Sequence, residues 1–120
     1  MAKPVRYAQL SPEWVVRPLP AEVIVSGDPL QQVQLYFSGP ENRVRSGVWQ
    51  CDVGAYRLAF GPTKHEFFHI LDGRIRIHDN EGGVTELLPG DSGVIPAGFT
   101  GVFEVIDYKT HSEMWEQSKI

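Results

Sequence analysis

Short runs of alternating apolar and polar residues, each ended by a turn containing glycine or proline, occupy most of this chain. Alternation with a period of two is typical of a half-buried β-strand, and no helical periodicity persists over two turns mid-chain. The predicted strands are residues 22–25, 33–37, 44–51, 56–60, 66–71, 75–78, 84–88, 93–95, 102–106 and 109–115. Evenly spaced short strands with such turns predict an all-β sandwich or barrel.

The dipeptide Asp72-Gly73 separates two of these predicted strands. Asp-Gly between alternating runs is a strong hairpin signal, because glycine adopts the positive φ of a tight turn. We therefore predict that the chain reverses direction between residues 71 and 74. A second reversal is predicted at residues 79–83, which contain Gly82 and Gly83.

Residues 1–20 contain four prolines and are predicted to form an irregular arm. Proline lacks a backbone donor, so this arm cannot lie in the middle of a sheet. Ser11 and Pro12 fit the cap and first position of one helical turn. Trp14 is expected to pack the arm onto the body or onto a neighbouring subunit. Residues 21–120 show no repeat, low-complexity tract or linker, which predicts one domain.

Composition excludes several classes of partner. The net charge of −4 and the pI near 5.5 argue against nucleic acid or an anionic membrane surface. The first twenty residues lack the apolar core of a signal peptide, and no apolar run reaches the roughly twenty residues of a membrane span. Cys51 is the single cysteine and cannot form an intrachain disulfide, which favours a reducing, cytoplasmic setting.

Glycine and proline spacings in the second half of the chain form a recognisable pattern. Glu66 is followed by Gly73, and Gly90 by Pro96 and Gly98. These spacings resemble the two motifs of the cupin superfamily. The resemblance covers roughly residues 45–110 and implies an all-β, single-domain cupin, a jelly-roll barrel or double-stranded β-helix.

Within the superfamily, the chain resembles the subfamily named after ureidoglycine aminohydrolase. Gly47-Val48-Trp49 is similar to its Gly-x-Trp segment, and Pro96–Gly101 to its Pro-Ala-Gly-Phe-x-Gly stretch. The enzyme itself resembles a two-cupin chain that holds a metal. The present chain is shorter than that, so we do not expect this specific activity.

Cupins hold a divalent metal with three histidines and a glutamate, and here only the glutamate, Glu66, is kept. The first histidine pair falls at Phe60 and Pro62, or one residue earlier, and the third at Gly101. One carboxylate is a poor site for a first-row metal, which normally takes three or four protein donors. We therefore expect no metal cofactor, with a site built by other histidines as the alternative.

The four histidines are expected to lie on the surface or at an interface. His65 and His69 are odd-spaced from Glu66 on the same predicted strand, so they face away from it. His78 ends a predicted strand, and His111 lies on the predicted last one. A shared external metal site using His69 is the weaker alternative.

The alternation along the predicted strands places aromatic and apolar side chains in the interior, together with one acidic residue, Glu66. The predicted inward residues are Tyr56, Leu58, Phe60, Glu66, Phe68, Ile70, Ile75 and Ile77, with a contribution from Trp49 on the neighbouring strand. Phe103 stands where the resembled subfamily often has a tryptophan, and the resemblance adds it to this set. In a packed core, Glu66 would need a partner such as the Tyr56 hydroxyl or a water. In a pocket, burial would raise its pKa and suit it to general acid or base catalysis.

We favour the pocket, with Glu66 as candidate acid or base. The candidate ligand-binding residues are Trp49, Tyr56, Leu58, Phe60, Phe68 and Phe103. Cys51 shares the face of Trp49 and is interpreted as a small buried hydrophobe rather than a nucleophile. Phe67, His69 and Leu71 on the outward phase would suit a homodimer interface, because an exposed apolar stripe favours being covered.

Three functions follow from this interpretation. The first is a binding module that holds a small organic metabolite in an aromatic-lined pocket anchored by Glu66. The second is a hydrolase or isomerase acting on a small nitrogenous or sugar-like metabolite. The third is a structural or regulatory dimer with a filled barrel. Metal content and interior volume distinguish the three.

Overall fold

The computed structural model describes the backbone of residues 2–118 and the side chains of residues 2–107. Within that part of the chain, nine strands and three short 3-10 turns confirm the all-β prediction. The strands are β1 (Val15–Arg17), β2 (Ile24–Gly27), β3 (Gln31–Ser38), β4 (Val44–Cys51), β5 (Gly54–Ala59), β6 (Lys64–Asp79), β7 (Val84–Leu87), β8 (Ser92–Ile95) and β9 (Thr100–Ser118). The turns are η1 (Tyr7–Gln9), η2 (Ala21–Val23) and η3 (Pro40–Asn42).

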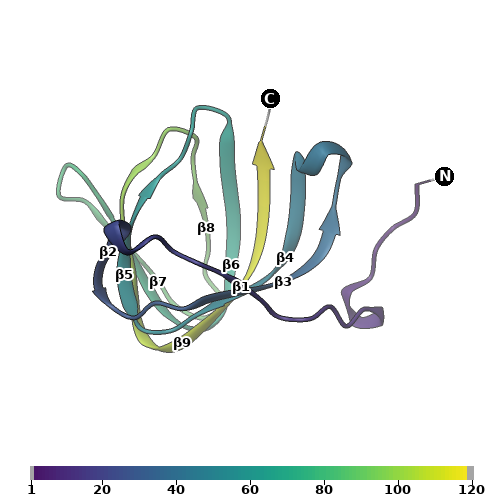
Figure 1. Ribbon diagram of the computed structural model, residues 1–120, viewed down its shortest axis with the longest axis horizontal. Helices are drawn as coiled ribbons and strands as arrows, with labels where there is room; N and C mark the ends of the chain where they lie inside the picture. The colour runs from purple at the N-terminus through teal and green to yellow at the C-terminus, as the bar shows by residue number, and fades with distance from the viewer. Residues whose placement is uncertain (1, 119–120) are drawn as a thin grey trace.

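Two long strands, β6 and β9, organise the whole fold. They pair antiparallel along their length, and both bend in the middle (Figure 1). On one side of the bend the strand order is β1-β3-β4-β9-β6-β8, and on the other it is β2-β5-β9-β6-β7. The bend folds one continuous sheet into two facing halves, the first containing β8 and the second β7, as expected from the resemblance to a cupin jelly roll.

The prediction that the chain reverses at Asp72-Gly73 is wrong. β6 runs through both residues, and its register with β9 shifts three times between Ile70 and Ile75. Gly73 does have the expected positive φ, at 89°, and its N–H bonds to the Asp72 carboxylate at 3.0 Å. Because β9 bends beside it and keeps pairing, the glycine makes a corner within one strand rather than a turn between two. The predicted strands 102–106 and 109–115 are likewise one strand, β9.

The N-terminal arm joins the sheet at its edge. β1 pairs with β3, with Arg17 opposite Gln31, which agrees with the expectation that a proline-rich segment avoids the sheet interior. The helical turn predicted at Ser11 and Pro12 does not form; the one turn of the arm is η1, and the Pro12 carbonyl instead accepts from the Gln34 side chain at 3.0 Å.

Two further contacts fasten the arm to this domain. The Tyr7 ring stacks on Tyr36 with 4.1 Å between centroids, and its hydroxyl donates to Ser46. Closer to β2, Leu19 and Val23 pack against the core. The arm therefore docks on its own barrel.

The core lies between the two halves of the sheet, and the predicted strand phase is confirmed. Its buried members are Val33, Trp49, Cys51, Tyr56, Phe68, Ile70, Ile75, Ile77, Leu87, Ile95, Phe103 and Val105. Phe67 and Leu71, on the opposite phase of β6, are exposed. Among the described residues, no helix is long and apolar enough to cross a membrane.

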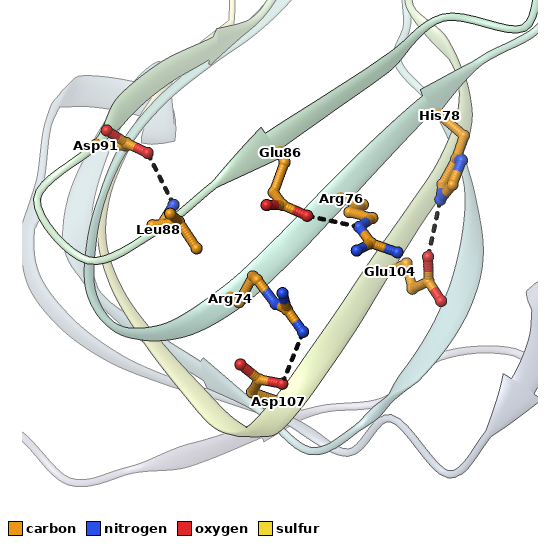
Figure 2. A network of polar contacts seen from close by, with 8 residues as sticks. All are labelled: Arg74, Arg76, His78, Glu86, Leu88, Asp91, Glu104 and Asp107. Carbon is orange, nitrogen blue, oxygen red and sulfur yellow. Dashed lines mark hydrogen bonds and ion pairs between the residues drawn. The ribbon is translucent and has the colours of Figure 1, made fainter.

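The outer face of the half of the sheet that contains β7 carries a row of ion pairs. Arg74, Arg76 and His78 follow one another along β6, and each reaches a carboxylate on a neighbouring strand (Figure 2). The pairs are Arg74–Asp107 at 3.2 Å, Arg76–Glu86 at 2.7 Å and His78–Glu104 at 2.8 Å. The alternation of β6 thus separates a charged outer face from an apolar interior.

Candidate ligand cavity

A cavity of about 710 Å³ opens between the two halves of the sheet. This volume is within the range of about 300–1,000 Å³ that is usual for small-molecule sites. All seven residues predicted from the sequence as site candidates line it: Trp49, Tyr56, Leu58, Phe60, Glu66, Phe68 and Phe103. Their alternation on β4, β5, β6 and β9 is what brings them to one interior.

Aromatic rings form one continuous wall of the cavity. Phe103 meets Trp49 edge to face and stacks on Tyr56, with 5.5 Å between ring centroids in both pairs. These three side chains come from three different strands and are each less than a tenth exposed. Such interlocked rings hold each other in place, so they present a rigid apolar surface.

Gln31 fixes the polar side of this aromatic wall. Its side-chain oxygen accepts a hydrogen bond from Trp49 Nε1 at 2.7 Å and another from the Tyr56 hydroxyl at 3.2 Å. The suggestion that the Tyr56 hydroxyl would partner Glu66 is therefore wrong. Buried polar groups of aromatic residues generally find such partners, and Gln31 is the nearer one.

The environment of Tyr56 favours its neutral form. Burial raises the pKa of the Tyr56 hydroxyl well above its usual range, and the electrostatic effects of Cys51 and Glu66 raise it further, while Arg17 opposes them. Tyr56 therefore stays protonated near neutral pH and keeps its hydrogen bond to Gln31. The same three effects place Cys51, Glu66 and Arg17 within electrostatic reach of one phenol.

Sequence reasoning missed the polar residues that the arm and its neighbours contribute. Arg17, Gln31 and Lys64 all line the cavity, together with Leu19 and Val23. Gln31 could have been found, because it shares the strand phase of Val33 two residues later. The arm residues carried no signal, since proline-rich sequence does not indicate where it docks.

Four charged residues line the cavity. Glu66 is half-buried on β6, and the ammonium of Lys64 lies 4.4 Å from the centroid of the Phe60 ring. The exposed side chain of Arg57 reaches out to the backbone carbonyl of Glu22. The described lining thus has three cations, with Arg17, and one carboxylate in a protein whose net charge is −4.

The donors present do not fit a cupin metal. Phe60 and Gly101, at two of the positions where cupins have histidine, both line the cavity. A side chain at Gly101 has no room, because an added Cβ would lie 2.1 Å from the backbone oxygen of His78. Among the described residues, no group of three His, Cys, Asp or Glu side chains is placed to hold a metal ion.

The described histidines lie away from Glu66, as the strand phase predicted. His65 Nδ1 accepts from the Ala97 N–H at 3.0 Å, and His69 Nδ1 bonds to the Ser92 hydroxyl at 2.8 Å. His78 pairs with Glu104 on the outer face (Figure 2). The side chain of His111 lies outside the described residues.

Residues 38–111 match the EutQ-like cupin domain, and this region contains all seven predicted site residues. The chain belongs to the EutQ-like cupin family. The finer likeness to ureidoglycine aminohydrolase-like cupins stays a prediction. No curated protein matches the chain in a sequence comparison.

Solved structures of similar fold support the cupin assignment. The Clostridium difficile EutQ protein is 16% identical, with a TM-score of 0.63 over 75% of this chain and 69% of that one. A Pseudomonas syringae protein of unknown function is 15% identical, with a TM-score of 0.75 over 88% of this chain and 44% of the other. KdgF from a Halomonas species is 11% identical, with a TM-score of 0.67 over 100% and 96% of the chains. At these identities the likeness extends to the fold alone.

Proposed function

We propose that this EutQ-like cupin is a binding module for a small organic metabolite. The observation that carries the proposal is the cavity of about 710 Å³, walled by interlocked aromatic rings and supplied with a few polar groups. A domain that needed only stability would fill this space, because protein interiors are close-packed. An apolar cavity with few convergent polar groups is the usual form of a ligand site.

Glu66 is the proposed polar anchor for a donor group of the ligand. It is half-buried on β6, beside the apolar Phe68, and it lines the cavity. A carboxylate accepts hydrogen bonds from hydroxyl or ammonium groups and makes stronger bonds than a neutral acceptor. It is also the acid or base that an enzymatic function at this site would use.

A cavity-filling substitution tests the proposal. Saturation-transfer NMR with a library of small metabolites would identify binders to the wild-type protein. Leu58→Trp adds an indole to the cavity wall and should abolish their signals. Val84→Trp adds the same group on the exposed face of β7, where Val84 is 56% exposed, and should leave them unchanged. Binding that survives Leu58→Trp would place the ligand elsewhere.

A hydrolase or isomerase is the second candidate for the same cavity. Its reaction would have to proceed without a metal held in the usual cupin way, so Glu66 would carry the proton transfer. Incubation of each identified binder with the protein, followed by mass spectrometry, separates the two. Chemical conversion that is lost in Glu66→Gln would favour the enzyme.

We also propose that two copies pair through the outer face of the half of the sheet that contains β8. Phe67 lies opposite Val94 across β6 and β8, with 42% and 60% of their surfaces exposed, and Leu71 is 45% exposed. Apolar residues exposed together on one face are typical of interaction sites. Light scattering should give the mass of a homodimer, and Phe67→Lys should return the monomer.

A cytoplasmic setting fits the single, fully buried Cys51.

A further inference from the structure

The orientation of the Gln31 carboxamide is fixed by chemistry. The indole Nε1 of Trp49 can only donate, so the Gln31 atom 2.7 Å from it must be the oxygen. The Tyr56 hydroxyl adds a second hydrogen bond to the same oxygen at 3.2 Å. Both lone pairs of Oε1 are therefore used, and the amide nitrogen must point the other way.

The Gln31 amide nitrogen borders the cavity. Gln31 is 5% exposed and lines the cavity, and within the described part of the chain Nε2 has no hydrogen-bond partner. In that same part, the one polar side-chain atom that is both buried and unpaired is Arg74 Nε. Nε2 of Gln31 therefore faces open space and offers two N–H donors to whatever occupies it.

Arg17 brings a positive charge to the same place. It lies directly opposite Gln31 in the antiparallel pairing of β1 and β3, where facing side chains share one side of the sheet about 4.5–5.5 Å apart at Cβ. Arg17 is half-buried, lines the cavity and is near enough to lower the pKa of Tyr56. Donors and positive charge thus converge at one end of the cavity.

Glu66 also lines the cavity, and it is near enough to raise the pKa of Tyr56. It precedes Ile70 on β6 by four residues, about 13 Å along a strand, and Ile70 and Trp49 face the same residue of β9. The cavity therefore contains donors and a positive charge at Gln31 and Arg17, and a carboxylate acceptor at Glu66 on a different strand. Trp49 and Phe103 supply an apolar wall of the same cavity.

We propose that the cavity is specific for a small organic acid whose carboxylate is bound by Gln31 Nε2–H and the Arg17 guanidinium. The apolar or aromatic body of the acid lies against Trp49 and Phe103. Both carboxylate-binding residues precede residue 38, outside the region that matches the family, so this specificity comes from the segment before the matched region. The inference rests on the proposed binding function and names its ligand class.

Three matched probes test the inference: benzoate, benzamide and benzylamine, which share a ring and differ in the head group. Titrations followed by NMR should give an affinity of the wild-type protein for benzoate about tenfold or more above that for benzamide, which has no charge. Gln31→Glu keeps an oxygen for Trp49 and Tyr56 but replaces the donor by a negative charge. It should weaken benzoate at least about tenfold and make benzylamine the preferred probe.

Gln32→Glu is the matched control, because it makes the same change one residue later on the outer face, where Gln32 accepts from Gln50 at 2.7 Å. It should leave the order of the probes unchanged. Circular dichroism establishes that each variant folds. If Gln31→Glu does not fold, Arg17→Gln supplies the test, since it should remove the preference of benzoate over benzamide.

The outcomes separate the two proposals. Equal binding of benzoate and benzamide by the wild-type protein would overturn the carboxylate specificity and leave the binding function standing. The same holds if benzoate binding is unchanged in both Gln31→Glu and Arg17→Gln. Absence of binding by all probes and all library compounds would overturn the binding function itself.

Discussion

The indole N–H of Trp49 donates a 2.7 Å hydrogen bond to the side-chain oxygen of Gln31, joining β4 to β3 in the wall of the cavity. Gln31→Leu would leave the Trp49 and Tyr56 donors without this acceptor. We expect a loss of about 2 kcal/mol in the free energy of unfolding, because buried donors without partners are costly. Urea denaturation followed by circular dichroism measures it.

A double-mutant cycle with Trp49→Phe isolates the hydrogen bond. Trp49→Phe removes the donor, so Gln31→Leu should cost about 1 kcal/mol less in that background. Gln34→Leu, which removes only a bond to the arm at Pro12, is the control and should cost the same in both backgrounds. Equal costs of Gln31→Leu in both backgrounds would show that this bond contributes nothing to stability.

Tyr56 should make the protein less stable at alkaline pH. Its pKa in the folded state is raised above the ordinary value of 10.0, so the folded state keeps a proton that the unfolded chain releases. Above pH 10 the free energy of unfolding should therefore fall, by up to about 1.4 kcal/mol per pH unit from this group. The stability that the raised pKa of Tyr56 contributes is fully present below pH 10. Tyr56→Phe should show a shallower decline in urea titrations from pH 9 to 11, and an unchanged slope would contradict the assignment.

Gly101 should tolerate no side chain. An added Cβ would meet the backbone oxygen of His78 at 2.1 Å and the Phe99 ring at 2.6 Å, so Gly101→Ala should destabilise the fold by about 2 kcal/mol or more. Gly61→Ala is the matched control, since nothing lies within 4 Å of its added Cβ. Thermal denaturation of both variants measures the difference, and similar melting temperatures would refute it.

Glu66→Gln should leave the fold intact and abolish ligand binding. Glu66 is half-buried, so its substitution by an isostere should change the free energy of unfolding by less than about 1 kcal/mol. Calorimetric titration with a binder found by NMR measures the affinity. Glu86→Gln, on the outer face beside Arg76, is the control and should bind normally. An unchanged affinity of Glu66→Gln would remove Glu66 from the site.

Elemental analysis of protein purified without an affinity tag or added metal should find no stoichiometric metal. The described donors do not form a site of three, and one carboxylate binds a first-row metal weakly. Near-stoichiometric manganese, iron, nickel or zinc would contradict this and favour the enzyme. Mutation of His65 and His69 to alanine would then show whether these histidines hold it.

Alternation predicted the interior of this domain well, because every strand has one face against the cavity. Phase alone places Tyr56, Leu58 and Phe68 inside, and each lines the cavity. Phe103, which the family resemblance indicated, lines it as well. Phase survives small errors in the predicted strand ends, since it depends only on the parity of positions along a strand.

Corners and the arm were harder to predict, for physical reasons. Asp72-Gly73 has the same sequence signal in a hairpin as in a bend, and only the pairing with β9 decides between them. Arg17 comes to the cavity through the pairing of β1 with β3, a contact between segments that the sequence does not relate. Gln31 was missed because a polar residue at the start of a strand usually faces solvent.

The corner at Gly73 has a consequence for how this domain could acquire new ligands. Both halves of the sheet that enclose the cavity contain parts of β6 and β9, so the angle of the bend in these strands influences the distance between the halves. A substitution at Gly73 would therefore change the volume of the cavity without altering any residue that lines it. The size of the ligand and its chemistry can therefore change independently. The backbone geometry at Gly73 affects the size, and the side chains of the N-terminal segment determine the chemistry.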